Sequence, residues 1–122
     1  MRVVLITAPP ERAEALATTL VEERLVACVN LLPGVTSVYF WEGKLCRDGE
    51  TLLVAKTGAE RMGELIRRVR DLHPYSVPEV IALPVQEGNA GYIEWVQRSV
   101  AGDAPPSARP PGSSPADLTQ PS

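Results

Sequence analysis

The sequence contains only one histidine and two cysteines, and this scarcity excludes several kinds of site. A single imidazole, His73, cannot build a two-histidine metal site or a histidine relay within one chain. Cys28 and Cys46 form no disulfide scaffold and match no zinc-ligand spacing. We therefore expect a protein of the reducing cytoplasm.

Long apolar runs and an excess of positive charge are missing as well. No run approaches the roughly 18 apolar residues that a membrane-spanning helix needs. The net charge is −3, so the chain offers no positive field to nucleic acid or to an anionic membrane. Residues 1–7 are typical of a first strand rather than of a secretory signal. We therefore expect neither nucleic acid nor a membrane as a partner.

Enzyme motifs are also lacking. The sequence has no GxxxxGK[ST] or GxGxxG loop, and no serine lies in a nucleophile elbow. Cys28 lies in an apolar run, where a buried and unreactive thiol is the simplest interpretation, and Cys46 is interpreted as an incidental surface thiol. We predict a binding protein without an organic cofactor. An enzyme is the alternative that a nucleophile and base within hydrogen-bond reach would support.

What the chain does contain is a regular alternation of strand-like and helix-like segments up to residue 100. Apolar residues at helical spacing predict two amphipathic helices and a short final one, at about 10–24, 58–72 and 90–100. Runs rich in β-branched residues predict strands at 3–7, 27–32, 35–41, 51–56 and 80–85. Pro84 places the last strand at a sheet edge. The order predicts an α+β, ferredoxin-like βαββαβ sandwich with an extra C-terminal helix.

Local signals predict where these segments begin and end. Pro33-Gly34 is typical of a break between strands, and Asp48-Gly49 of a two-residue hairpin turn. Thr57 to Glu60 fits a capping box, and Asn89 a helix cap. His73-Pro74 is expected to end the second helix.

The composition changes after residue 100. Residues 101–122 hold six of the twelve prolines, and Leu118 is their only large apolar side chain. Such a segment cannot bury enough surface to offset the entropy of ordering it. We predict one domain over residues 1–100, followed by a disordered proline-rich tail.

Two clusters of aromatic and polar residues exceed what helix or strand periodicity requires. They are Trp41-Glu42-Gly43-Lys44 and His73-Pro74-Tyr75. Prolines stiffen the second cluster, which suits a ligand pocket or a subunit contact. The alternative is a helix-ending turn whose histidine caps carbonyls. An RNA recognition motif is disfavoured, because the aromatics gather at the end of one strand instead of on two central strands.

Several long motifs resemble the CutA (CutA1) divalent-cation-tolerance family in collinear order over residues 3–100. They are the run 27–39, then 41–44, Leu72-His73-Pro74-Tyr75, the run 77–84, and Gly88-Asn89 with Tyr92, Trp95 and Val96. The resemblance implies a homotrimer with the architecture of PII signalling proteins. It also implies a link to tolerance of divalent cations, copper above all, and no catalytic activity.

The resemblance also implies site residues. Those expected near the cleft between subunits are Trp41, Glu42, Lys56, His73, Tyr75 and Glu79. Cys28 and His73 are the candidate metal ligands, for copper or another divalent ion, with any site shared across subunits because one chain supplies too few ligands. The alternative is a PII-like small-ligand sensor, or a trimer that anchors an unidentified protein, without a physiological metal.

Overall fold

The structure is a computed structural model that describes residues 1–102. Its elements are β1 (Arg2–Ala8), α1 (Pro10–Glu22), β2 (Cys28–Trp41), β3 (Lys44–Thr57), the 3₁₀ turn η1 (Ala59–Arg61), α2 (Met62–Leu72), β4 (Val80–Pro84) and α3 (Ala90–Ser99). None of the described helices is long and apolar enough to cross a membrane. From residue 103 onward the predicted tail lies outside the described residues.

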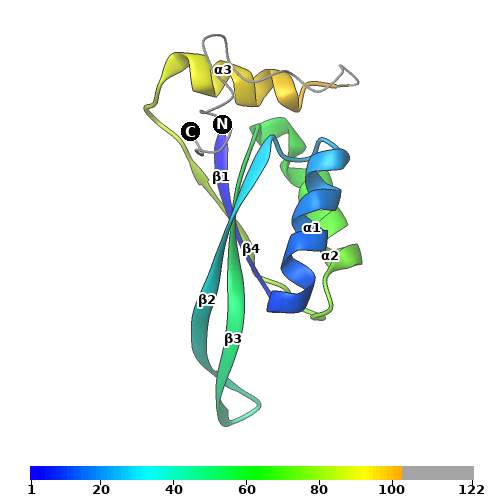
Figure 1. Ribbon diagram of the computed structural model, residues 1–122, viewed down its shortest axis with the longest axis vertical. Helices are drawn as coiled ribbons and strands as arrows, with labels where there is room; N and C mark the ends of the chain where they lie inside the picture. The colour runs from blue at the N-terminus through cyan, green and yellow to red at the C-terminus, as the bar shows by residue number, and fades with distance from the viewer. Residues whose placement is uncertain (103–122) are drawn as a thin grey trace.

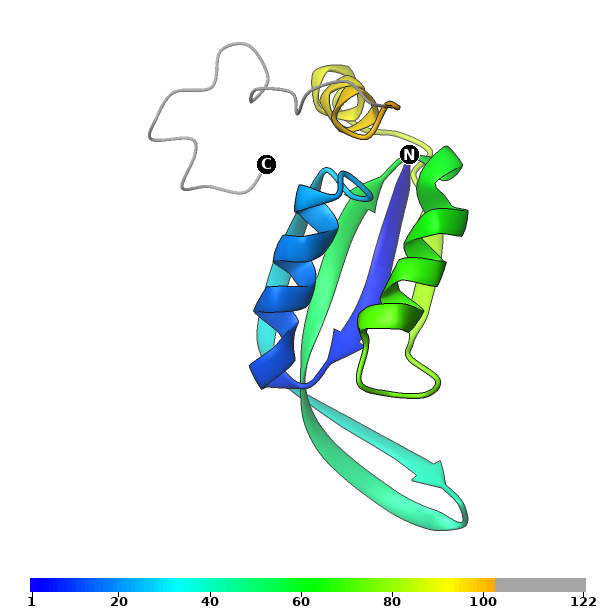
Figure 2. The same ribbon diagram turned by 90° about the vertical axis from the view of Figure 1, so that its right-hand side faces the viewer.

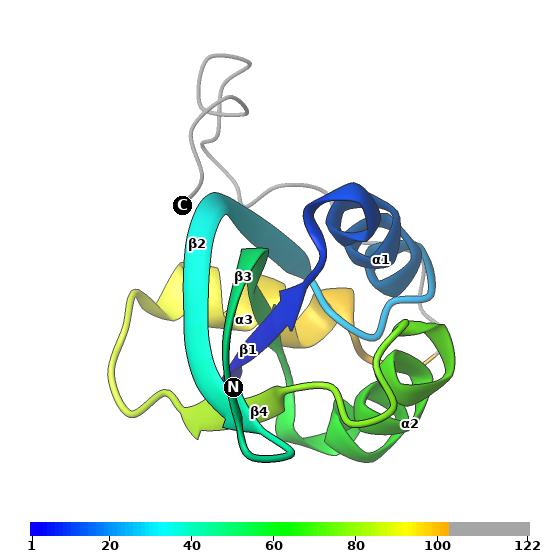
Figure 3. The same ribbon diagram turned by 90° about the horizontal axis from the view of Figure 1, so that it is seen from below.

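The four strands form one antiparallel sheet in the order β2-β3-β1-β4, and α1 and α2 pack side by side on one of its faces (Figures 1 and 3). This arrangement confirms the predicted ferredoxin-like α+β class. β4 is an edge strand, as Pro84 predicted, because proline has no N–H to give to a further strand.

The hydrophobic core lies between the sheet and the two helices. Alternate residues of β1, namely Val4, Ile6 and Ala8, are fully buried against them. The remaining core residues are Ala13, Leu16, Ala17, Leu20, Leu25, Val26, Leu53, Ala55, Leu65 and Val69. The helical stripes read from the sequence therefore face the sheet.

No described helix covers most of the other face of the sheet, which we call the open face (Figure 1). Its residues are the alternate positions Val3, Leu5, Leu52, Val54, Ile81 and Leu83, which share a face by register. Ile81 and Leu83 are each 52% exposed. Only one end is covered by α3, where the Tyr92 hydroxyl lies 3.3 Å from the Cys28 sulfur.

Beyond β1, strands β2 and β3 continue as a two-stranded arm, residues 35–50, that projects from the sheet (Figures 1 and 2). Its turn is at Glu42-Gly43, where both residues have positive φ (51° and 78°). The turn predicted at Asp48-Gly49 is wrong, since Asp48 pairs with Ser37 inside the ladder. The break predicted at Pro33-Gly34 is likewise only a bulge within β2, with Gly34 at φ 79°.

The helix-end signals were borne out at two of three places. Asn89 caps α3, since its Oδ1 accepts from the Gly91 N–H at 3.0 Å, and α2 ends at His73, whose backbone is extended. The capping box at Thr57 is wrong. Thr57 still belongs to β3 and is fully buried; its hydroxyl donates to the Leu25 carbonyl at 2.7 Å instead of accepting from a helix N–H.

Candidate functional site

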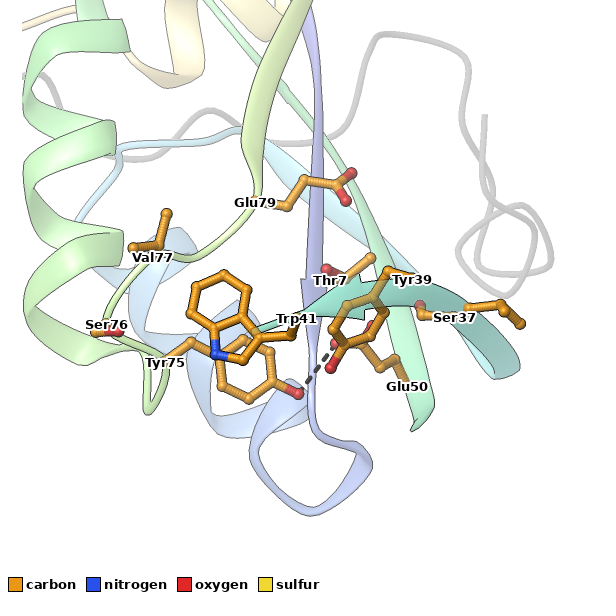
Figure 4. Close-up of a pocket in the computed structure, with 10 residues that line it drawn as sticks. Thr7, Ser37, Tyr39, Trp41, Glu50, Tyr75, Ser76, Val77 and Glu79 are labelled. Atoms are coloured by element: carbon orange, nitrogen blue, oxygen red, sulfur yellow. Dashed lines mark hydrogen bonds between the residues drawn. The ribbon is translucent and has the colours of Figure 1, made fainter. Parts of the chain in front are cut away.

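A pocket of about 700 Å³ lies where the arm leaves the sheet (Figure 4). Residues from β1, β2, β3 and the segment between α2 and β4 line it: Thr7, Ser37, Val38, Tyr39, Trp41, Glu50, Tyr75, Ser76, Val77 and Glu79. In Figure 4 the rings of Trp41, Tyr39 and Tyr75 lie near Glu50. The volume falls in the range of small-molecule sites, which is about 300–1,000 Å³.

Tyr75 and Glu50 form the best-defined polar contact of this pocket. The Tyr75 hydroxyl donates to Glu50 Oε2 at 3.1 Å, and Glu50 is only 5% exposed. Burial, followed by this hydrogen bond, raises the pKa of Tyr75 to about 12. The phenol therefore stays neutral and acts as a donor, while the carboxylate accepts.

A second phenol–carboxylate pair lies along the arm. The Tyr39 hydroxyl donates to the carboxylate of Asp48, which is the diagonal cross-strand neighbour because Asp48 is opposite Ser37. This hydrogen bond is the main reason why the pKa of Tyr39 is raised to about 12. Both tyrosines are thus held by acidic partners.

These two phenols predict how the protein titrates in alkali. With an ordinary pKa of 10 and a folded value near 12, each holds its proton longer in the folded state. Their stabilising contribution is complete below pH 10 and is lost as the pH rises towards 12. In an ultraviolet absorbance titration we expect Tyr39→Phe and Tyr75→Phe each to remove one late-ionising phenol. If the absorbance change near pH 12 were the same in the wild type and in both variants, this expectation would be contradicted.

His73 contacts the lining residue Tyr75 but does not itself line the pocket. Its Nε2–H donates to the Thr7 carbonyl at 2.7 Å, and its Nδ1 accepts from the Tyr75 N–H at 3.1 Å. The ring is 7% exposed and lies 4.7 Å from the Tyr75 ring, centroid to centroid. Both nitrogens are therefore used in fixing the start of the loop that carries Tyr75, so neither is available to a metal in this arrangement.

Three of the six predicted cleft residues, Trp41, Tyr75 and Glu79, line the pocket together. Glu42 lies instead in the exposed arm turn. Lys56 lies near the opposite end of the sheet, where its ammonium group donates to Asn30 Oδ1. The remaining predicted residue, His73, does not line the pocket but contacts Tyr75, which does.

The two candidate metal ligands do not meet within the chain. His73 contacts Thr7, at one end of β1. Cys28 is opposite Lys56 of β3, which is itself opposite Val3 at the other end of β1. Four residues of strand separate the two ends, about 13 Å. Within residues 1–102, no three His, Cys, Asp or Glu side chains converge as a metal site. The described residues of one chain therefore do not assemble a metal site.

Sequence reasoning missed Glu50 and Tyr39. Glu50 directly follows the hairpin turn predicted at Asp48-Gly49, and that prediction gives its side chain no inward direction. The signal that would have found it is the alternation of β3 through Leu52 and Val54, which places Glu50 on the same face. Tyr39 was noted only as one member of an aromatic run.

Comparisons with known proteins agree with this fold. Residues 2–99 match the family described as CutA1 divalent ion tolerance protein. The divalent-cation tolerance protein CutA of Thermus thermophilus is 51% identical over 98 residues, which cover 80% of this chain and 95% of the relative.

A solved structure described as the PII-like protein CutA from Nostoc is 39% identical, with a TM-score of 0.77 over 80% of this chain and 95% of the other. The chloroplastic CutA 1 protein of rice is 47% identical over 98 residues, 80% of this chain, and the match spans about half (55%) of its length. The chain therefore belongs to the CutA1 divalent ion tolerance protein family.

Proposed function

We propose that this chain is a non-catalytic binding protein that works as a PII-like homotrimer in the cytoplasm and binds a small ligand in the pocket at the base of its arm. The observation that carries the assembly is the open face of the sheet. Ile81 and Leu83 are half exposed there on an edge strand, and such surfaces usually mark an interface.

The arm supports the same proposal. Residues Lys44 to Glu50 pair only with β2, and an isolated two-stranded hairpin is marginally stable in water. The arm nevertheless exposes large apolar side chains that do not line the pocket, with Phe40 at 73% and Leu45 at 62%. Contact with neighbouring copies would bury this surface and hold the arm, together with the pocket at its base, in place.

The first test is the mass of the protein in solution. Light scattering of the full chain is expected to give about 40 kDa, three times the 13.2 kDa of one chain. The mass should not change on dilution across the micromolar range, since an apolar interface of this kind is stable. A mass of one chain would refute the trimer.

The chemistry of the pocket supports binding rather than catalysis. Its Tyr75–Glu50 hydrogen bond lies in a space that is large enough for a small molecule, and Tyr39, which also lines it, is held by Asp48 of the arm. The relatives are named for divalent-cation tolerance rather than for a reaction. A thermal-shift screen of small molecules should therefore give hits that a Trp41→Leu variant loses. Hits that persist in the variant would place the ligand elsewhere.

Copper is the second candidate ligand, and the observation that favours it is the partly exposed thiol of Cys28. Thiolate and imidazole are suitable ligands for copper, and the donors would come from more than one subunit. In a copper titration of the assembled protein, we expect Cys28→Ser to weaken binding more than His73→Gln does, because both nitrogens of His73 are engaged. Equal, weak binding by the wild type and both variants would reject a specific copper site.

We further propose that neither nucleic acid nor a membrane is a partner, in keeping with the net charge of −3. The name of the rice relative includes a chloroplast location, so compartment differs among family members. Fractionation of cells that express the full chain would test the cytoplasmic proposal. Recovery of the protein with membranes would refute it.

A further inference from the structure

The pocket at the base of the arm is lined by carboxylates and contains no basic side chain. Glu50 and Glu79 line it, whereas none of its ten lining residues is lysine, arginine or histidine. The chain as a whole is also acidic. Within one chain, no basic side chain of this lining would attract an anionic ligand, whereas the two carboxylates would attract a cation.

Glu50 makes the case stronger than exposed acidic residues would. It is 5% exposed, and its carboxylate accepts a hydrogen bond from a neutral phenol, that of Tyr75. A carboxylate removed from water is costly unless opposite charge or further donors compensate it. A cation entering the pocket would supply the missing positive charge.

The walls of the pocket indicate what kind of cation fits. Three rings, those of Trp41, Tyr39 and Tyr75, line the same space, and two aliphatic side chains, Val38 and Val77, add apolar surface (Figure 4). Aromatic faces attract organic ammonium groups through cation–π interactions, with tryptophan the best partner. A bare metal ion would gain little from such walls and prefers several oxygen, nitrogen or sulfur ligands.

Size and ligand number point the same way. A space of about 700 Å³ is far larger than a metal ion requires. Among the residues that the structure describes, no three metal-ligating side chains come together. We propose that the pocket binds an organic ammonium ion, with Glu50 and Glu79 balancing its charge and Trp41, Tyr39 and Tyr75 enclosing its carbon groups. This inference rests on the proposed function, because it names the ligand class of the same pocket.

The test compares two probes that differ only in charge. Choline and its neutral isostere, in which carbon replaces the quaternary nitrogen, are titrated into the full chain by calorimetry. We expect choline to bind at least about tenfold more tightly than the isostere, since the ring and carboxylate contacts act on the charge. Equal or tighter binding of the isostere, or of succinate as an anion, would overturn the ammonium proposal but leave a ligand pocket in place.

Variants locate the binding. Glu50→Gln keeps an acceptor for the Tyr75 hydroxyl but removes the charge, and should weaken choline by about tenfold. Trp41→Leu should weaken choline binding several-fold, because the indole ring is lost. Glu87→Gln, an exposed carboxylate outside the pocket, is the matched control and should bind as the wild type does. Equal loss in Glu87→Gln would show that only overall charge matters and would refute the site.

Two further outcomes separate this inference from the proposed function. If a divalent metal ion binds in a Glu50-dependent manner and excludes choline, the ammonium assignment is wrong while the pocket is right. If none of the probes binds and the solution mass is that of one chain, both the inference and the proposed function fail.

Discussion

A Leu83→Asp variant is expected to run in solution as a folded single chain of 13.2 kDa rather than as an assembly. Leu83 lies on β4 opposite Val3, half exposed in the open face. In one chain the new carboxylate would remain in water and cost little. In an assembly that covers this face, each copy would bury an unpaired charge, at a cost of several kcal/mol.

Light scattering and far-ultraviolet circular dichroism together check this expectation. The matched control is Ile66→Asp on α2, where an isoleucine 39% exposed faces away from the open face. It should keep the mass of the wild type. If Leu83→Asp kept that mass too, the open face would not be the interface. If it lost its helical signal, the milder Leu83→Ser would be measured in its place.

His73→Ala is expected to lower the free energy of unfolding by about 2–4 kcal/mol. The substitution opens a cavity at a position that is 7% exposed and removes two hydrogen bonds. The carbonyl of Thr7 and the N–H of Tyr75 would both lose a partner. Because Tyr75 would no longer be fixed, small-ligand binding in the pocket should weaken as well.

Urea denaturation at fixed protein concentration measures the first effect, since the stability of an oligomer depends on concentration. Tyr75→Phe is the control, because it removes only the hydroxyl bond to Glu50 and should cost about 1 kcal/mol. A loss in His73→Ala no greater than in this control would mean that His73 is not a structural support. Ligand binding equal to the wild type would mean that it does not position Tyr75.

Much of the fold could be predicted because its signals are periodic. The stripe at Ala13, Leu16, Ala17 and Leu20 faces the sheet, and Pro84 marks an edge. These signals depend on which face of an element is buried, and the sequence records that repeatedly. The errors lie where one short motif had to decide alone.

The arm is the clearest of these errors. Asp48-Gly49 and Glu42-Gly43 both place a glycine where a tight turn is possible, and local chemistry favours the first. The ladder decides otherwise, because β3 is continuous from Lys44 to Thr57 and pairs in register with β2. Moving the turn by six residues turned Glu50 from a loop residue into a lining residue of the pocket.

The candidate site was predicted only in part for a related reason. Trp41, Tyr75 and Glu79 stood out as aromatic and polar side chains without a periodic role, and they line one space. Lys56 and Glu42 were selected by motif alone, and motifs carry no information on distance. Partners that join remote segments, such as His73 with Thr7, appear only when the chain is folded.

The bulge at Pro33-Gly34 has a consequence for the timing of folding. On the N-terminal side of the bulge, β2 belongs to the four-stranded sheet, whose strands β1 and β4 come from distant parts of the chain. On the C-terminal side, β2 and β3 form the arm, which closes through its own local turn. The arm can therefore form quickly as a hairpin, and in the proposed trimer its amide protons would gain lasting protection from exchange once the neighbouring chains cover it. Amide exchange in the arm would then report association, and exchange in β1 would report the folding of the single chain.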